Sequence, residues 1–181
     1  ETKLPQTQYV NYNILTQFLA CQIYFLQSEK KYEWDVSLYP RILYDGIVTL
    51  VDLDYLGMNA RTHALERRLE VSPSVLDDAY GNLKFHSEFH QQAAFKIIDA
   101  LNILLDELPI KIMSDNQTLD KIDIHIRNLK RELKIYKDWI SGDYSQFEEY
   151  EIKKTPIELK NIFTHVVGKE YAISKISQLA D

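Results

Sequence analysis

Between Leu119 and Ile140, apolar side chains recur strictly at steps of four and three residues, and this repeat most limits how the chain can fold. The positions of this seam are Ile122, Ile126, Leu129, Leu133, Tyr136 and Ile140. A stripe with that period predicts a helix that packs on a neighbouring helix at a shallow angle, either within one chain or across a dimer. Only five glycines and five prolines interrupt 181 residues, which favours long helices elsewhere. We therefore predict an all-α fold, a bundle of about five or six long, mainly antiparallel helices.

The first half of the chain predicts further helices. Apolar residues on most sides of a helix from about Gln6 to Lys30 predict that this helix is central in the bundle. A second helix is expected to start near Ser37 or Pro40 and to run to a kink or turn at Gly57, although the β-branched residues 47–49 also permit a strand. A charged helix is expected from Ala60 to Glu70.

Proline and capping residues mark the remaining expected boundaries. Ser72 followed by Pro73 predicts a new helix start, because Ser can cap and Pro is tolerated in a first turn. That helix is expected to bend at Gly81 and to stop at Pro109. Thr155, Pro156 and Glu158 form a capping box, which predicts a last helix. No repeat or linker divides the sequence, so we expect one helical domain over residues 1–181.

Charge and cysteine content limit the function classes. The net charge of −6 argues against a general nucleic-acid or anionic-membrane binder, because those affinities come from clustered Lys and Arg. The one cysteine, Cys21, lies in an apolar run and is expected to be a small core residue. A single thiol suits the cytoplasm or another reducing compartment. The chain begins with Glu1, so a removed targeting segment would leave no trace in it.

No apolar stretch reaches the roughly 18 residues that a membrane span needs, so a soluble protein without a span is expected. The longest candidate, Phe18 to Leu26, is interrupted by Gln22.

His86 and His90 are the first candidate site. Four residues apart on a helix, the two imidazoles would share one face and could hold a single divalent metal such as Zn or Fe. Further ligands would have to come from other helices, where the candidates are His63, His125, His165, Asp77 and Asp78. The alternative is one buried, hydrogen-bonded histidine and one at the edge of the core. The catalytic H-E-x-x-H pattern is absent, because serine and not glutamate follows His86.

A basic ridge on the 119–140 helix is the second candidate site. Arg127, Lys130, Arg131, Lys134 and Lys137 lie largely away from the apolar seam. Such a ridge could contact phosphate or an acidic partner. The alternative is the solvated face of an amphipathic helix, partly neutralised by Glu132 and Asp138.

Twelve tyrosines are the most unusual feature of the composition. Exposed tyrosine is enriched at protein interfaces, whereas buried tyrosine needs a partner for its hydroxyl. The sequence therefore permits a tyrosine-rich core edge or a binding surface formed by the N-terminal half and the acidic, aromatic segment 143–151.

Two short stretches, residues 39–57 and 131–137, resemble segments of a helical family of thylakoid proteins. The spacing between them differs from that family's, so no residue role is carried over and the sequence assigns no family. No Gly-rich phosphate loop, G-x-S-x-G motif or paired cysteines occur. We therefore expect a helical interaction domain that docks a protein partner or self-associates, rather than an enzyme. A metal-dependent enzyme using His86 and His90, or a nucleic-acid-associated module using the ridge, are the alternatives.

Overall fold

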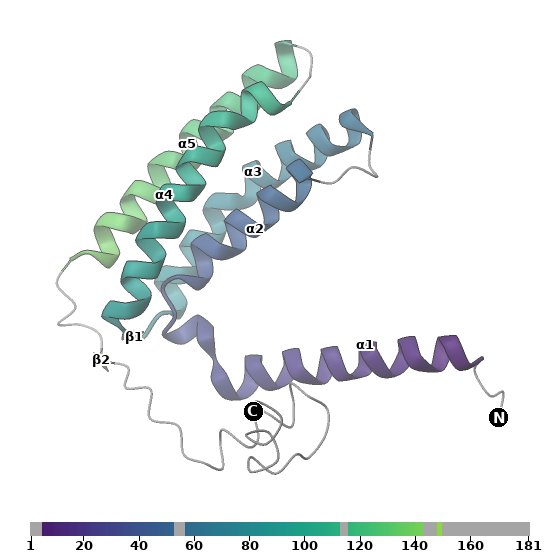
Figure 1. Ribbon diagram of the computed structural model, residues 1–181. Helices are drawn as coiled ribbons and strands as arrows, with labels where there is room; N and C mark the ends of the chain where they lie inside the picture. The colour runs from purple at the N-terminus through teal and green to yellow at the C-terminus, as the bar shows by residue number, and fades with distance from the viewer. Residues whose placement is uncertain (1–4, 53–56, 113–115, 143–147, 150–181) are drawn as a thin grey trace, which may run out of the picture. The chain divides into compact units, whose positions relative to one another are not determined.

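The computed structural model describes residues 5–52, 57–112, 116–142 and 148–149. It contains the helices α1 (Gln6–Tyr24), α2 (Leu38–Asp52), α3 (Met58–Asn82), α4 (Glu88–Lys111) and α5 (Asn116–Ile140) (Figure 1). A π-helical turn (Phe25–Glu29) follows α1, and a 3-10 turn (Lys31–Glu33) precedes α2. The two-residue strands β1 (Phe85–His86) and β2 (Glu148–Glu149) pair in parallel. The prediction of an all-α bundle with five or six long helices is confirmed.

The chain divides into two units, residues 32–150 and residues 1–31 with 151–181. The first unit contains α2 to α5, and of the second the structure describes α1 and the turn that follows it. The predicted helix that begins at Thr155 lies outside the described residues, as does the 143–151 segment apart from the backbone of 148–149. The expectation of one domain over residues 1–181 stays a prediction.

The unit of residues 32–150 is a four-helix bundle whose helices alternate in direction along the chain (Figure 1). Around the bundle, α2 neighbours α3 and α4, and α5 neighbours the same two helices. The consecutive helices α3 and α4 therefore lie on a diagonal, and residues 83–87, which include β1, connect them. Neighbours on two sides of the bundle, α2 with α4 and α3 with α5, run parallel.

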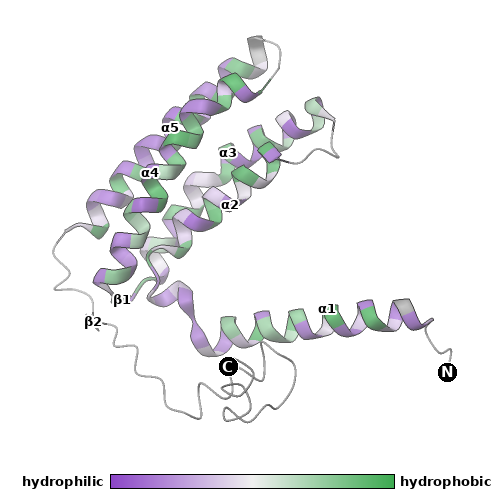
Figure 2. Ribbon diagram, viewed as in Figure 1, coloured by the Kyte–Doolittle hydropathy of each residue, from purple (hydrophilic) through white to green (hydrophobic). Residues whose placement is uncertain are grey.

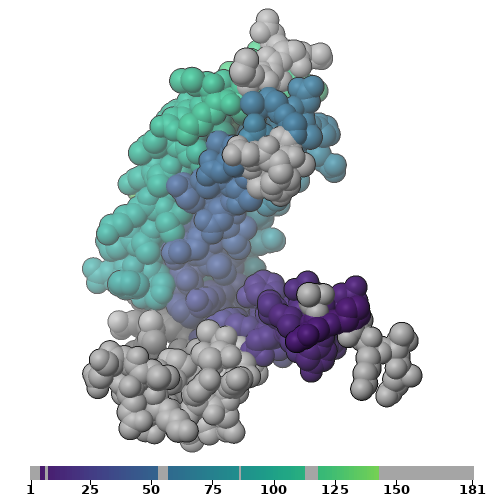
Figure 3. Space-filling model, turned by 45° about the vertical axis from the view of Figure 1, so that its right-hand side comes forward, coloured from purple at the N-terminus to yellow at the C-terminus, as the bar shows by residue number. Residues whose placement is uncertain are grey.

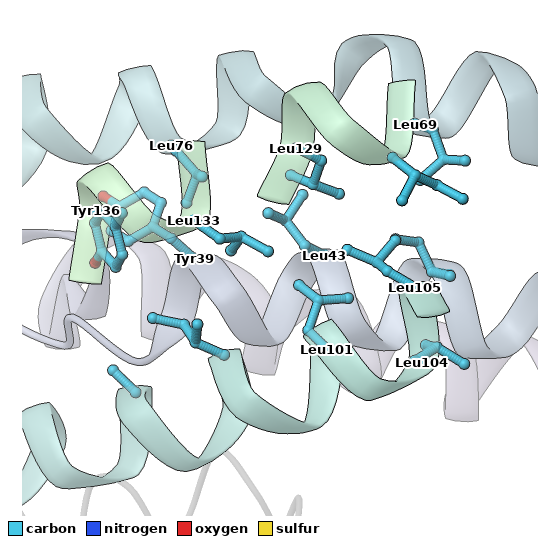
Figure 4. Close-up of a cluster of buried hydrophobic side chains, with 14 of the residues drawn as sticks. Tyr39, Leu43, Leu69, Leu76, Leu101, Leu104, Leu105, Leu129, Leu133 and Tyr136 are labelled. Atoms are coloured by element: carbon cyan, nitrogen blue, oxygen red, sulfur yellow. The ribbon is translucent and has the colours of Figure 1, made fainter. Parts of the chain in front are cut away.

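The predicted seam of α5 faces the core of this bundle. Its six residues expose between 0% and 7% of their surface. Figure 4 shows Leu129, Leu133 and Tyr136 pointing toward leucines of the other three helices. The seam is therefore satisfied within this unit, which decides between the two alternatives that the sequence left open. Residues 47–49 lie in α2, and Ile47 is fully buried, so the strand alternative is excluded.

Two tyrosines fasten the segment before α2 to the bundle. The Tyr136 hydroxyl donates to the Val36 carbonyl oxygen at 2.7 Å, and the Tyr39 hydroxyl donates to the Tyr32 carbonyl oxygen at the same distance. The Lys84 backbone N–H donates to the Glu33 carbonyl oxygen at 2.8 Å. The chain before α2 is thus held by α5, by α2 itself and by the segment that follows α3.

The predicted helix start at Ser72 and Pro73 is wrong, because α3 runs unbroken from Met58 to Asn82. Ser72 is buried, and its hydroxyl donates to the Arg68 carbonyl oxygen at 2.7 Å instead of capping a new helix. Apolar residues on one face remain buried on both sides of Pro73, namely Leu65, Leu69, Leu76 and Ala79. Burying this continuous stripe outweighs the one backbone hydrogen bond that proline removes.

The other expected boundaries of this region also shift. The helix breaks at Leu83, whose backbone is extended, and not at Gly81. The next helix, α4, continues through Pro109 and ends at Lys111. Pro109 lies in the last turn of α4, where it removes one backbone hydrogen bond, and the adjacent Leu108 is still buried in the core.

Pro73→Ala is expected to raise the free energy of unfolding of the bundle by about 1–2 kcal/mol. The substitution restores an N–H inside a continuous helix, and this gain exceeds the added freedom of the unfolded chain. Urea denaturation of the full chain measures the change. If Ser72 capped a new helix instead, its replacement would cost about 1 kcal/mol in the same assay. A destabilised Pro73→Ala variant would show instead that residue 73 marks a helix start.

Candidate docking surface

α1 exposes many large apolar side chains in a stretch that carries no charge. No Asp, Glu, Lys, Arg or His occurs from residue 4 to residue 28. Nine large hydrophobic side chains of α1 and its following turn expose 49–64% of their surface: Tyr9, Val10, Tyr12, Ile14, Leu15, Phe18, Leu19, Ile23 and Leu26. Figure 2 shows hydrophobic and hydrophilic residues alternating along α1. The prediction that this helix is central in the bundle is wrong, because its described side chains are exposed and the bundle core is built from the other unit.

Helical spacing divides the apolar residues of α1 into two stripes. One stripe contains Val10, Ile14, Phe18, Cys21 and Phe25, and its last two members are only half exposed. The other stripe contains Tyr12, Leu15, Leu19, Ile23 and Leu26, which all expose about half of their surface or more. Cys21, expected in a core, is thus half-buried on the more covered side of an exposed helix.

The helix ends at a defined point. The Lys30 backbone N–H donates to the Phe25 carbonyl oxygen at 2.9 Å, which closes the π-helical turn. Lys30 is left-handed, with φ of 45°, and this conformation stops the helix. The Lys31 ammonium group lies 5.7 Å from the centre of the Phe25 ring. The first charged residues after residue 3 therefore lie at the end of the apolar stretch.

A shallow apolar groove lies between α2 and α4 in the other unit. It encloses about 350 Å³ and is lined by Tyr44, Val48, Val51, Asp52, Ala100, Ile103, Leu104, Glu107 and Lys111. Figure 3 shows α2 and α4 side by side on this face. Ile103 on its edge is 62% exposed. A hydrogen bond of 2.6 Å from Lys111 to the Glu107 carboxylate raises the pKa of Lys111 and neutralises one rim. The sequence alone does not reveal this groove, because the groove depends on which two helices are neighbours.

The two candidate metal ligands do not share a helix. His86 lies in β1, whereas His90 lies in the first turn of α4. The His90 Nδ1 atom is 3.0 Å from the Ser87 hydroxyl, and the His90 ring packs edge-on against Trp34 with 5.0 Å between ring centres. These contacts agree with the alternative of a hydrogen-bonded histidine at the core edge.

The other candidate ligands are dispersed. Among the residues that the structure describes, no group of three or more His, Cys, Asp or Glu side chains is placed to hold a metal ion. His63 is 71% exposed and lies 3.7 Å from Glu66, and His165 lies outside the described residues. A metal site at His86 and His90 stays a prediction, although its premise of one helical face does not hold.

Two lysines of the basic ridge form ion pairs with carboxylates of α4. Lys130 pairs with Asp106 at 2.5 Å, and Lys137 pairs with Asp99 at 2.7 Å. The Lys137 ammonium group also lies 5.5 Å from the centre of the Phe95 ring.

The outer members of the ridge remain on the exposed side. Arg131 pairs with the adjacent Glu132 at 2.9 Å, and Arg127 donates to the Asp123 carbonyl oxygen at 3.3 Å. Lys134 is exposed. The ridge therefore fits a solvated face whose edge is joined to α4 by ion pairs. Binding of an anionic partner there stays a prediction.

The described tyrosines of the N-terminal third are found both in the core and on the surface. Tyr39 is a core residue with a hydrogen-bonded hydroxyl, and burial raises its pKa above the usual value. Tyr9 and Tyr12 are exposed at 56% and 57%. Among the described tyrosines of this third, Tyr9 and Tyr12 therefore lie on the exposed apolar surface of α1.

No described helix is both long enough and apolar enough to cross a membrane. No protein-family description, curated protein or solved structure matches the chain.

Proposed function

We propose that the chain is a helical protein-interaction domain in which the four-helix bundle is the stable scaffold and α1 carries the docking surface. The observation that supports this proposal is the exposure of 49–64% at nine large apolar side chains on one uncharged helix. Together they expose roughly 900 Å² of surface, if a large side chain presents about 150–250 Å². Patches on monomeric proteins are rarely larger than a few hundred Å², and larger ones mark interaction sites.

The surface of the bundle differs from that of α1. Its exposed apolar residues are distributed over its four helices, for example Val71 on α3, Phe89 on α4 and Ile135 on α5. Single exposed apolar residues are ordinary on protein surfaces. The contrast favours α1 over the helices of the bundle as the docking element.

Photo-crosslinking in cells that express the protein tests the proposal. A benzophenone amino acid replaces Leu15 or Phe18 on α1, one on each stripe. Matched controls carry it at Val71 or Ile135, which are apolar and similarly exposed at 55% and 47%. We expect protein adducts from the α1 positions and none from the controls. Absence of adducts at both α1 positions, or equal adducts at all four, would contradict the proposal.

A further inference from the structure

A small cavity lies where the end of α2, the first turns of α3 and the end of α4 meet. It encloses about 20 Å³, and among the described residues its lining contains Arg61, Thr62 and Lys111 together with apolar side chains such as Leu65 and Ile112. One water molecule needs roughly 10–15 Å³ of such space, so the cavity has room for a single small occupant. The cavity belongs to the four-helix bundle and contains no described residue of α1.

Arg61 brings to this cavity a positive charge that lacks an opposite charge among the described residues. Its Nη1 group donates to the Val51 carbonyl oxygen at 3.1 Å, and its Nη2 atom lies 3.7 Å from the Met58 sulfur. Its Nε atom is buried and has no hydrogen-bond partner among the described residues. Removing a charge from water costs free energy unless hydrogen bonds and an opposite charge offset the loss. The half-buried Arg61 side chain therefore calls for one more acceptor that carries negative charge.

Two further side chains that line the cavity are able to donate hydrogen bonds. Thr62 exposes only 4% of its surface, and its hydroxyl has no hydrogen-bond partner among the described residues. The Lys111 ammonium group donates to Glu107 at 2.6 Å and carries three N–H groups in all. Glu107 lines the neighbouring groove between α2 and α4, and is not among the residues that line this cavity. The described charged residues of the cavity lining are thus both cations.

We propose that this cavity binds a small monovalent anion, chloride, with Arg61, Thr62 and Lys111 as its ligands. An anion accepts hydrogen bonds from all of these groups and supplies the charge that Arg61 lacks, and such charge-assisted bonds are the stronger ones. A water molecule would also have to donate its own hydrogens, for which the lining offers few acceptors. Phosphate or a carboxylate ligand has several heavy atoms and needs more space. The site lies in the scaffold, so it does not depend on docking through α1.

Urea denaturation of the full chain in sodium chloride and in sodium gluconate at equal ionic strength tests the site. Gluconate is too large for the cavity and controls for the general effects of salt. Tryptophan fluorescence follows the unfolding. We expect about 0.5 M chloride to raise the folding equilibrium constant about tenfold relative to gluconate, which corresponds to a dissociation constant of about 50 mM.

Three variants assign this gain to the cavity. Arg61→Gln removes the charge at the cavity and is expected to abolish the chloride gain. Arg67→Gln removes the same charge from an exposed position on the same helix, and is expected to keep the gain. Thr62→Val has nearly the same shape as the wild type and removes only the hydroxyl. We expect it to be at least as stable as the wild type in gluconate, because that hydroxyl lacks a partner, and to lose most of the chloride gain.

The line width of the chloride NMR signal measures binding to the folded protein, so it also serves where a variant is less stable. Chloride that exchanges with a protein site gives a broader signal. The wild type and Arg67→Gln are expected to broaden the signal more than Arg61→Gln and Thr62→Val do. Equal stability in the two salts would show that water alone occupies the cavity and would overturn the inference. A chloride gain that all three variants retain, or that Arg61→Gln and Arg67→Gln lose equally, would also overturn it.

Discussion

Leu133→Ala is expected to lower the free energy of unfolding of the four-helix bundle by about 3 kcal/mol, within the range of about 2–5 kcal/mol for such changes. Leu133 is fully buried and belongs to the α5 seam. It points toward residues from the other helices of the bundle (Figure 4). Truncation removes apolar contact on several sides at once, and a close-packed core relaxes only partly into the space.

Both tryptophans make this measurement specific to the bundle. Trp34 and Trp139 lie within residues 32–150, and the chain contains two tryptophans in all. Urea denaturation followed by tryptophan fluorescence therefore reports the unfolding of this unit.

A matched control for Leu133→Ala lies two residues along the same helix. Ile135 is 47% exposed, so Ile135→Ala is expected to change stability by no more than about 0.5 kcal/mol. Equal effects at the two positions would contradict the placement of the seam in the core.

Tyr136→Phe and Tyr80→Phe are expected to change stability in opposite directions, although both remove only a hydroxyl. Tyr136 is fully buried and donates to the Val36 carbonyl oxygen at 2.7 Å. Removing the Tyr136 hydroxyl leaves that buried carbonyl without this donor, which is expected to lower the free energy of unfolding by about 1–3 kcal/mol. The Tyr80 hydroxyl is buried and has no hydrogen-bond partner among the described residues. Removing it is expected to be neutral or to stabilise the bundle by up to about 1 kcal/mol.

The pair forms its own control, because the two rings are neighbours. The Tyr80 and Tyr136 rings have centres 6.1 Å apart, and each ring also packs on Trp139. Effects of packing are thus shared, and the difference between the variants isolates the hydroxyl groups. The same fluorescence-detected denaturation at pH 7 measures both, and destabilisation by Tyr80→Phe as large as that by Tyr136→Phe would contradict the assignment.

Alkaline pH gives Tyr80→Phe a second signature. Burial raises the pKa of Tyr80 above its usual value of 10.0, with a smaller contribution from Glu132. The unfolded chain therefore loses the Tyr80 proton at lower pH than the folded chain does. The contribution of this group to the free energy of unfolding is therefore constant below pH 10 and falls as the pH rises above 10. The advantage of Tyr80→Phe over the wild type is expected to grow above pH 10.

Local periodicity in the sequence determined which stretches of this chain are helical. The α5 seam could be predicted in full, because its repeat of four and three residues leaves only one face to bury. The extent of the first helix was also predictable: α1 and its π-helical turn cover Gln6–Glu29, against an expected Gln6–Lys30. The candidate docking surface could be predicted in part, because the uncharged apolar stretch of residues 4–28 is visible in the sequence.

Only the tertiary structure decided what each helix packs against. The same apolar pattern that predicted a central helix belongs to an exposed one, because periodicity does not say whether a partner covers a face. Pro73 continues α3 since the buried stripe on both sides of it outweighs one missing hydrogen bond. Lys130 and Lys137 pair with carboxylates that α4 supplies from more than 20 residues away. Helical periodicity is a local property, so the sequence predicts it. Burial and ion pairing depend on residues far apart in the chain, so only the tertiary structure decides them.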